Sequence, residues 1–193
     1  MRTGRDEFRK NVRIINAIIF IMKKIPNKFL HVLWNITNGW KGKLGIGIRY
    51  CILKVLCKDC GTNVYVAENV EIKNMKNLTI GSNVSIHRFS YIDAAGEISI
   101  GNDVSIAHNA SLVSFDHTWN DKSIPIKYNP TYLGFIKIED DVWIGCGVRI
   151  LKNVTIKSRS IVAAGSIVTK NIESNSISGG VPNKKIGCTK ALN

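Results

Sequence analysis

The chain has few acidic residues, few prolines and no long apolar run. It has 193 residues, with 14 Asp and Glu against 27 Lys and Arg, which gives a formal net charge of +13. Because it has only four prolines and 16 glycines, and 45% of its residues are hydrophobic, it is neither collagen-like nor disordered. The length and composition predict one ordinary folded domain, with an appendage at most.

The sequence also contains no membrane span, and its cysteines argue against a disulfide framework. The five cysteines include one close pair, Cys57 and Cys60, without a second Cys or His pair at zinc spacing, which favours a reduced protein. The longest apolar run, residues 14–22, is interrupted by Asn16 and is about half the ~20 residues that span a bilayer. No small-residue cleavage site follows this run. We therefore expect a cytoplasmic protein.

The positive charge is distributed unevenly along the chain. Residues 1–60 contain 13 Lys and Arg and 3 Asp and Glu, a net charge of +10, whereas residues 61–193 contain 14 and 11, a net charge of +3. The second segment has no basic aromatic stripe and no recognised nucleic-acid-binding motif. The charge is therefore a property of the N-terminal third, and we do not expect a nucleic-acid partner.

Apolar residues recur at helical spacing in this N-terminal third, which predicts two or three short helices. These residues are Phe8, Val12, Ile15, Ile19, Met22, Phe29, Val32, Leu33, Ile36, Trp40, Ile48, Cys51, Ile52, Val55 and Leu56. Pro26 is expected to separate the first two helices, and four glycines to loosen the chain before the third. They are Gly39, Gly42, Gly45 and Gly47. Basic residues lie between the apolar ones, as in helices on an anionic membrane surface; packing on the next domain or a partner subunit is the alternative.

From Val66 onward the period becomes six. Each unit starts with an aliphatic residue, and the starting positions are 66, 72, 80, 86, 92, 100, 106 and 112, then 138 to 168 in steps of six. The steps from 72 to 80 and from 92 to 100 each contain two extra residues. A β-solenoid absorbs such an insertion as a wider turn, whereas a helix or an antiparallel sandwich would lose its core register. Ranks of aliphatic residues at this period predict stacked β-coils.

Three stretches within the repeats carry a family resemblance. They are residues 106–117, residues 141–145, and residues 162–170 with 179–184. The chain from about 61 to 190 resembles the hexapeptide-repeat acyltransferases, and most specifically the sugar and polysaccharide O-acetyltransferases such as the maltose, galactoside and streptogramin enzymes. The resemblance implies an all-β fold, a left-handed parallel β-helix, with acetyl-CoA as co-substrate, no metal, and a homotrimer with the coenzyme A groove between subunits. The handedness comes from the family, since the general crossover rule favours the right hand.

The division that follows is a basic helical region, residues 1–60, and an acyltransferase domain, residues 61–193. An excursion from the repeat, the loop 116–137, contains His117 near its start, and loops of this length in a compact fold are commonly functional. A sugar hydroxyl is a poor nucleophile, and a neutral imidazole can take its proton. His117 matches the family's catalytic histidine, so the resemblance implies that it is the general base; a histidine that caps a turn beside Asp116 is the alternative.

The resemblance also implies acceptor-side and cofactor-side residues. His87 stands where the maltose and galactoside enzymes carry an acceptor-contacting Asn, and Asp93 lies near their acceptor-binding acid. Asp116 is the third acceptor-side candidate and could orient the loop or the imidazole, whereas His108 is expected to be structural or interfacial. The coenzyme A candidates are Trp143, Cys146, Ala164, Thr169, Lys170, Lys184 and Lys185. Trp143 is expected to expose its ring, to brace the active-site wall or to pack in the trimer interface.

These observations favour an acetyl-CoA-dependent O-acetyltransferase that acts on a sugar of a bacterial surface polysaccharide or its lipid-linked precursor, at the inner face of the cytoplasmic membrane. N-acetylation of an amino-sugar nucleotide is the alternative, although residues 1–60 lack a Gly-rich phosphate loop. A zinc enzyme like the β-helical carbonic anhydrases would need three convergent histidines. The spacings of His87, His108 and His117 do not match that arrangement.

Overall fold

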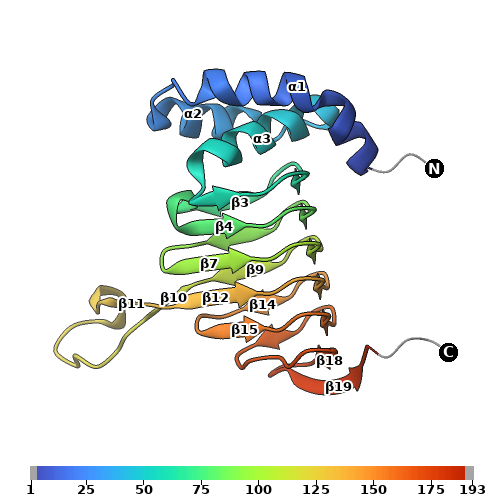
Figure 1. Cartoon of the computed structure of the whole chain (residues 1–193). Coiled ribbons are helices and arrows are strands. Elements are labelled where there is room, and N and C mark those ends of the chain that lie inside the picture. The colour runs from blue at the N-terminus through green and yellow to red at the C-terminus, as the bar shows by residue number, and fades with distance from the viewer. Residues whose placement is uncertain (1–3, 190–193) are drawn as a thin grey trace.

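The structure is a computed structural model that describes residues 4–189, so residues 1–3 and 190–193 of the two predicted regions lie outside the described residues. Figure 1 shows a column of stacked β-coils with helices across its N-terminal end and a hairpin that projects from its side. We call the helices (residues 4–56) the helical cap and the projecting segment (residues 114–134) the arm.

The helical cap contains three helices, as the apolar spacing predicts. They are α1 (Gly4–Met22), α2 (Asn27–Thr37) and α3 (Gly42–Leu56). Pro26 precedes α2 directly, in agreement with the prediction. The expectation that the glycines precede the third helix is wrong, because Gly45 and Gly47 lie inside α3. Gly45 is required there by packing, since a Cβ at this position would collide with the backbone carbonyl of Trp40.

The apolar stripes of the helices have different environments. Ile19 and Met22 of α1 are buried in the core, so this part of the stripe packs inward. In α2, Leu30 and Trp34 are buried, whereas Phe29, which belongs to the predicted stripe, is 55% exposed. Both α1 and α2 contact α3, which lies on the first coil. The helical cap therefore covers the apolar end of the column, which would otherwise be open to water.

Arg49 joins the helical cap to the first coil. Its side chain is completely buried, and its Nε donates a hydrogen bond to the carbonyl of Val66, at 2.9 Å. Its Nη1 donates to the carbonyls of Thr37, Asn38 and Trp40, at 3.2, 3.3 and 2.9 Å. Carbonyls at a helix C-terminus have no partner within the helix and carry partial negative charge. One guanidinium therefore satisfies the end of α2 and fixes it against the coil.

Parallel strands form the three faces of the column. The first sheet contains β1 (Asp59–Cys60), β4 (Leu78–Ile80), β7 (Glu97–Ile100), β12 (Phe135–Ile138) and β15 (Val154–Ile156). The second contains β2 (Tyr65–Val66), β5 (Ser85–Ile86), β8 (Ser105–Ile106), β13 (Trp143–Ile144), β16 (Ile161–Val162), β18 (Ser176–Gly179) and the antiparallel β19 (Lys184–Cys188). The third contains β3 (Glu71–Lys73), β6 (Tyr91–Asp93), β9 (Ser111–Val113), β14 (Arg149–Ile150) and β17 (Ile167–Val168). This confirms the predicted parallel β-helix.

The register of the strands confirms the period of six. One rank of the second sheet has Ile86 paired with Ile106 and Ile144 paired with Val162, and each of these residues is completely buried. Each coil therefore buries its inward side chain against the coils above and below. The interior is a continuous column of aliphatic residues, which explains why this part of the sequence repeats so strictly.

The coils turn at three corners: the first corner joins the first sheet to the second, the second corner joins the second to the third, and the third corner returns to the first. Left-handed residues stack at the first two corners, and most are Asn, Asp or Gly, which tolerate this conformation. They are Asn63, Asn83, Asp103, Asp141, Arg159 and Asn175 at the first corner, and Asn69, Phe89, Asn109, Gly147 and Gly165 at the second. The two-residue insertions lie at the third corner, at the 3-10 helix η1 (Met75–Asn77) and at residues 94–96, as wider turns. This confirms how the repeat absorbs them.

The arm leaves the third corner as an antiparallel hairpin. It contains β10 (Phe115–His117), the 3-10 helix η2 (Ile126–Tyr128) and β11 (Thr131–Leu133). The predicted end of the excursion at Lys137 is wrong, because Lys137 lies in β12 and pairs with Ser99. The excursion ends at Gly134, whose N–H donates to the Ser114 carbonyl, at 2.8 Å, and whose carbonyl accepts from the N–H of Glu97, at 3.0 Å. These bonds close the arm at its root.

Candidate active site

His117 lies on the arm, outside the packed column. It pairs with Thr131 in the hairpin, its side chain is exposed, and its ring meets Phe115 edge-on at 6.3 Å between centroids. A hollow of about 250 Å³ surrounds it, lined by the neighbouring arm residues and by Lys152 of the coil. An accessible imidazole in a hollow can accept a proton from a bound hydroxyl, which is what the predicted general base requires.

Asp116 fastens the arm. One carboxylate oxygen accepts a hydrogen bond from the backbone N–H of His117, at 2.9 Å, and the other lies 3.8 Å from Nζ of Lys152. The same ammonium lies 4.9 Å from the centre of the Tyr132 ring. Asp116 and Lys152 thus tie the hairpin to the coil beneath it. Asp116 is predicted to orient either the loop or the imidazole, and these contacts orient the loop.

Asp93 lies at the third corner, at the end of β6, and is buried. Its carboxylate accepts hydrogen bonds from the side-chain amide of Asn74, at 2.8 Å, and from the hydroxyl of Tyr91 and the backbone N–H of Ala95, each at 3.1 Å. Its carbonyl accepts from the hydroxyl of Ser114, at 2.9 Å. The predicted acceptor-side acid is thus held rigidly beneath the root of the arm, with its hydrogen-bonding capacity largely used within the chain.

His87 lies at the second corner, directly after β5, with an exposed side chain. Its ring lies 5.6 Å from that of Tyr65 in the preceding coil. Partial desolvation lowers the pKa of His87 below its ordinary value of 6.5, and the nearby charges of His108 and Arg88 lower it further. The imidazole is therefore neutral at pH 7, and it can either donate or accept a hydrogen bond.

Two of the predicted coenzyme A residues share the second corner. Cys146 and Ala164 occupy equivalent positions of successive coils, and the carbonyl of Cys146 accepts a hydrogen bond from the N–H of Gly165, at 2.8 Å. Both side chains are small, and the cysteine is only partly buried. Two small side chains in line at one corner suit a narrow pantetheine chain.

The remaining coenzyme A candidates lie toward the C-terminal end of the column. The backbone N–H of Thr169 donates to the side-chain oxygen of Asn183, at 3.1 Å, which brings Thr169 next to the start of β19. Lys170, Lys184 and Lys185 are all exposed. These candidates therefore lie near the C-terminal end of the column, with Thr169 and Lys170 directly after β17 of the third sheet and the two lysines of β19 at the edge of the second.

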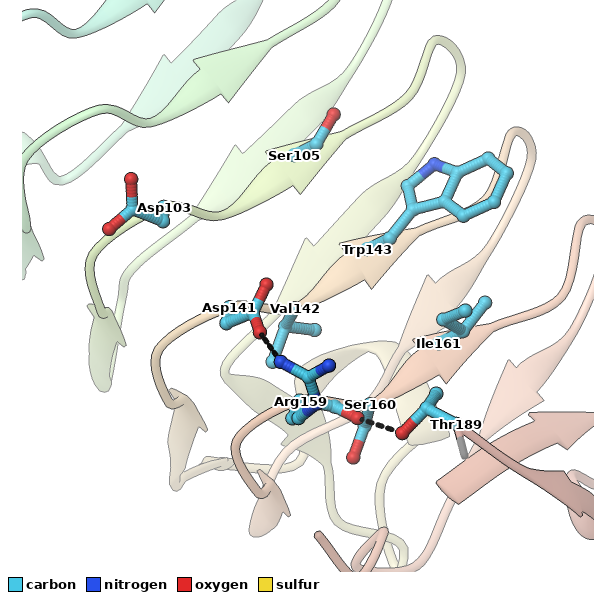
Figure 2. A pocket seen from close by; sticks show the side chains of 9 residues that line it. All are labelled: Asp103, Ser105, Asp141, Val142, Trp143, Arg159, Ser160, Ile161 and Thr189. Atoms are coloured by element: carbon cyan, nitrogen blue, oxygen red, sulfur yellow. Dashed lines mark hydrogen bonds and ion pairs between the residues drawn. The ribbon is translucent and has the colours of Figure 1, made fainter. Parts of the chain in front are cut away.

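Trp143 exposes its ring, as predicted, and is 54% exposed on the outer face of the second sheet. Together with Asp141 and Arg159, Trp143 lines a hollow of about 380 Å³. Figure 2 shows the side chains that line it. A guanidinium nitrogen of Arg159 lies 3.2 Å from a carboxylate oxygen of Asp141. Sequence reasoning missed Arg159. A signal existed, because Arg159 occupies a left-handed corner position where the preceding coils have Asn or Asp.

The candidates thus fall into two groups at different corners. His117, Asp116 and Asp93 belong to the third corner, whereas His87 and the small residues near Cys146 belong to the second. The arm projects away from the column (Figure 1). Among residues 4–189, no group of three or more His, Cys, Asp or Glu side chains could hold a metal ion.

Comparisons with known proteins agree with this architecture. A family model for the bacterial transferase hexapeptide (six repeats) matches residues 135–170. Galactoside O-acetyltransferase of Escherichia coli is 33% identical over 135 residues, which are 69% of this chain and 65% of that protein. A Saccharomyces cerevisiae protein classed as an acetyltransferase is 30% identical over 141 residues, which are 70% of this chain and 68% of that protein.

A solved structure with the same fold is a galactoside acetyltransferase in complex with coenzyme A. It has a TM-score of 0.74 and 28% identity, over 88% of this chain and 82% of that one. The chain spans between 45% and 65% of the length of three of the curated relatives that it matches. From the repeats, the fold and these similarities, the chain belongs to the hexapeptide-repeat acyltransferases, in the branch of the galactoside and maltose O-acetyltransferases.

Proposed function

We propose that this chain is an acetyl-CoA-dependent O-acetyltransferase that acetylates a sugar hydroxyl. The observation that carries the proposal is the exposed imidazole of His117 in its hollow on the arm, in a fold shared with a galactoside acetyltransferase that binds coenzyme A. The acceptor that suits the charge of the helical cap is a saccharide of a bacterial surface polysaccharide or its lipid-linked precursor.

In the proposed reaction, the neutral imidazole of His117 takes the proton of the sugar hydroxyl while the hydroxyl oxygen attacks the thioester carbonyl carbon. The tetrahedral intermediate then collapses as the carbon–sulfur bond breaks. The proton passes from the imidazolium to the sulfur, which leaves as the thiol of coenzyme A. Asp116 and Lys152 hold the arm in position, so that the imidazole loses little freedom when the acceptor binds.

For the cofactor, Cys146 and Ala164 would line the pantetheine chain, with Trp143 at its side. Thr169 would meet the far end of the chain, and Lys170, Lys184 and Lys185 would approach the phosphates. Exposed ammonium groups suit phosphates because they act as mobile point charges.

We also propose a homotrimer, which the separation of the two groups of candidates supports. The general base on the arm and the acceptor-side His87 lie at different corners of one chain, and they would share a site where the arm of one copy lies against the second corner of the next. Three such contacts, related by rotation about an axis along the columns, close a ring.

Attachment to the inner face of the cytoplasmic membrane is the last element of the proposal. Among the described residues, no helix is both long and apolar enough to cross a membrane. The helical cap nevertheless exposes large apolar side chains at Ile14 (63%), Ile21 (60%), Phe29 (55%), Val32 (54%) and Ile36 (62%). Lys24 and Lys28 lie 4.7 and 5.1 Å from the ring centres of Phe20 and Phe29. Exposed apolar groups beside cations are what a helix on an anionic lipid surface needs.

The enzymatic test measures coenzyme A release by mass spectrometry from acetyl-CoA and an oligosaccharide. His117→Ala should lower the turnover rate by about 100-fold or more, the usual contribution of a general base. His31→Ala, an exposed histidine of α2, is the matched control and should leave the rate unchanged. Acceptor-dependent release that His117→Ala does not alter would refute the catalytic assignment. A hydroxylamine-resistant product would identify an amide, and with it N-acetylation.

The membrane test measures co-sedimentation with vesicles of phosphatidylglycerol and phosphatidylcholine. Replacing Ile21 and Phe29 by Glu should reduce binding, because both apolar contact and positive charge decrease. A matched double variant, Ile126→Glu with Ile186→Glu, removes exposed apolar side chains of the arm and of β19. Equal binding by the two double variants would contradict attachment through the helical cap.

A further inference from the structure

An apolar groove of about 380 Å³ lies between the helical cap and the first coil. Helices α1 and α3 and strand β2 with the turn before it form its walls, with Phe8, Ile15, Ile46, Tyr50, Val64 and Tyr65 among the lining residues. We call it the cap groove. Its size lies in the range of small-molecule sites, and its aromatic and aliphatic lining is typical of them.

The floor of the cap groove is preformed. Tyr50 is buried, and its hydroxyl donates a hydrogen bond to the carbonyl of Gly61, at 3.1 Å. The ring of Phe8 meets the ring of Tyr50 edge-on, at 5.4 Å between centroids. The aromatic surface is thus fixed by contacts within the chain, and an occupant would not have to order it.

Gly47 keeps the cap groove open. A Cβ at Gly47 would meet no atom within 4 Å, although the residue lies inside α3, where glycine destabilises a helix relative to alanine. Gly45, two residues earlier, has a packing reason in the carbonyl of Trp40. No atom within 4 Å of a Cβ explains Gly47, and because Gly47 lines the groove, a larger side chain there would occupy free space of the groove.

The cap groove leads to the acceptor side of the site. Tyr65 lines the groove, and its ring lies 5.6 Å from that of His87. Lys43 lies at the groove as well, on a cap whose sequence region has a net charge of +10. Tyr65 therefore belongs both to the wall of the cap groove and to the ring contact with His87, the candidate for acceptor binding.

We infer that the cap groove binds the aliphatic chain of a lipid-linked saccharide acceptor, with the saccharide directed toward His87 and the linking phosphate among the basic side chains of the helical cap. An aliphatic chain brings no polar groups that would need partners, whereas a peptide segment would bring backbone N–H and C=O groups to a largely apolar wall. The inference rests on the proposed function, because it specifies the acceptor of that reaction.

The first experiment needs no catalysis. Calorimetric titration of the full-length protein with hexyl, decyl and dodecyl phosphate, below their micelle concentrations, should give affinities that rise at least tenfold from hexyl to dodecyl. Gly47→Leu, which fills the groove, should lower the dodecyl phosphate affinity at least tenfold. Gly47→Ala, the matched control, should leave it within about twofold, because a methyl group occupies little of the space.

If Gly47→Leu lowers the midpoint of thermal unfolding, the titration is repeated with Ile46→Asn, which makes the groove wall polar. Ile46→Leu is then the control. An affinity that does not depend on chain length, or one that a folded groove variant leaves unchanged, overturns the inference.

The second experiment separates the inference from the proposed function. Gly47→Leu should transfer acetyl groups to a free oligosaccharide at the wild-type rate but should show at least a tenfold higher KM for the same oligosaccharide on a polyprenyl phosphate. Equal KM values for wild type and variant on the lipid-linked acceptor refute the groove while the enzymatic proposal stands. Absence of transfer to either acceptor by the wild type refutes the enzymatic proposal, and the titration still decides whether the groove binds aliphatic chains.

Discussion

The column of coils and the helical cap bury their apolar residues in different ways. In the column, each coil repeats the inward residue of the last, so that Ile86, Ile106 and Ile144 form one completely buried rank. In the helical cap, burial depends on single contacts that do not repeat, such as those of Arg49. The column is therefore encoded by a period, whereas the helical cap is encoded by particular pairs of residues.

The same contrast holds for charge and for chemistry. The column region is nearly neutral, and its corners carry the candidate site, whereas the region of the helical cap has a net charge of +10. A periodic interior leaves the corners free to vary, because corner side chains do not take part in the core. The helical cap then has a separate role, which is to close the apolar end of the column.

The largest expected effect comes from removing Arg49, whose buried guanidinium links these two regions. Arg49→Met should destabilise the protein by about 3–5 kcal/mol, because the Val66 and Trp40 carbonyls lose the side-chain donor that they have in Arg49. The Thr37 and Asn38 carbonyls each lose one donor and keep a backbone N–H. Hydrogen exchange should show lost protection in residues 4–56 and in the first coil, with the later coils protected as before.

Arg49→Lys is the informative control, since it keeps the charge but cannot reach four carbonyls with a fixed fork. If Arg49→Met loses protection evenly over all the coils, the helical cap and the column unfold as one unit. That result would contradict the separate stabilisation of the two regions.

A cavity inside the column should have a somewhat smaller effect. Ile106→Ala should cost about 3 kcal/mol, because its side chain is completely buried between Ile86 and Ile144 and the ranks above and below cannot close the gap. Chemical denaturation measures it. The matched substitution Leu30→Ala in α2 should cost a similar amount but leave the exchange protection of the later coils unchanged. If both variants expose the same segments, the two regions do not differ in how they propagate a defect.

The period in the sequence was sufficient to predict the sheets, the core ranks and the wider turns. It was not sufficient for the end of the arm, because β12 starts at Phe135, before the aliphatic count resumes at Ile138. Nor could it predict that His117 and His87 lie at different corners, since corner assignment depends on where each strand ends. In the helical cap, spacing predicted the helices, but it did not distinguish the buried Ile19 from the exposed Phe29.

A smaller effect is expected at Phe89, a corner position where most other coils have Asn, Asp or Gly. Phe89 adopts a left-handed conformation, φ 61°, at the second corner, between the equivalent Asn69 and Asn109, and it is 55% exposed. Phe89→Asn should stabilise the protein by about 1 kcal/mol, because a bulky side chain is strained there. Phe89 lies two residues after His87, so the gain should come with a higher KM for the acceptor. Thermal unfolding and steady-state kinetics measure the two effects.

Asn109→Phe supplies the reciprocal change one coil away and should destabilise by about the same amount. A stabilised Phe89→Asn variant with unchanged kinetics would mean that the aromatic side chain has no function at this corner. Phe89 would then be a strained corner residue whose cost in stability serves no purpose at the site.

The smallest expected effect is a dependence of stability on pH. Partial desolvation lowers the pKa of His87 in the folded chain, so the unfolded chain binds a proton first as the pH falls below about 6.5. Stability should therefore be constant above this value, decline as the pH falls, and level off once the folded imidazole is protonated too. His87→Gln should remove this decline, measured as the denaturation midpoint between pH 5 and pH 7. Since His87 belongs to the column, the change should appear in the exchange of the coils around β5 and not in that of the helical cap; a decline that persists in His87→Gln must come from another group.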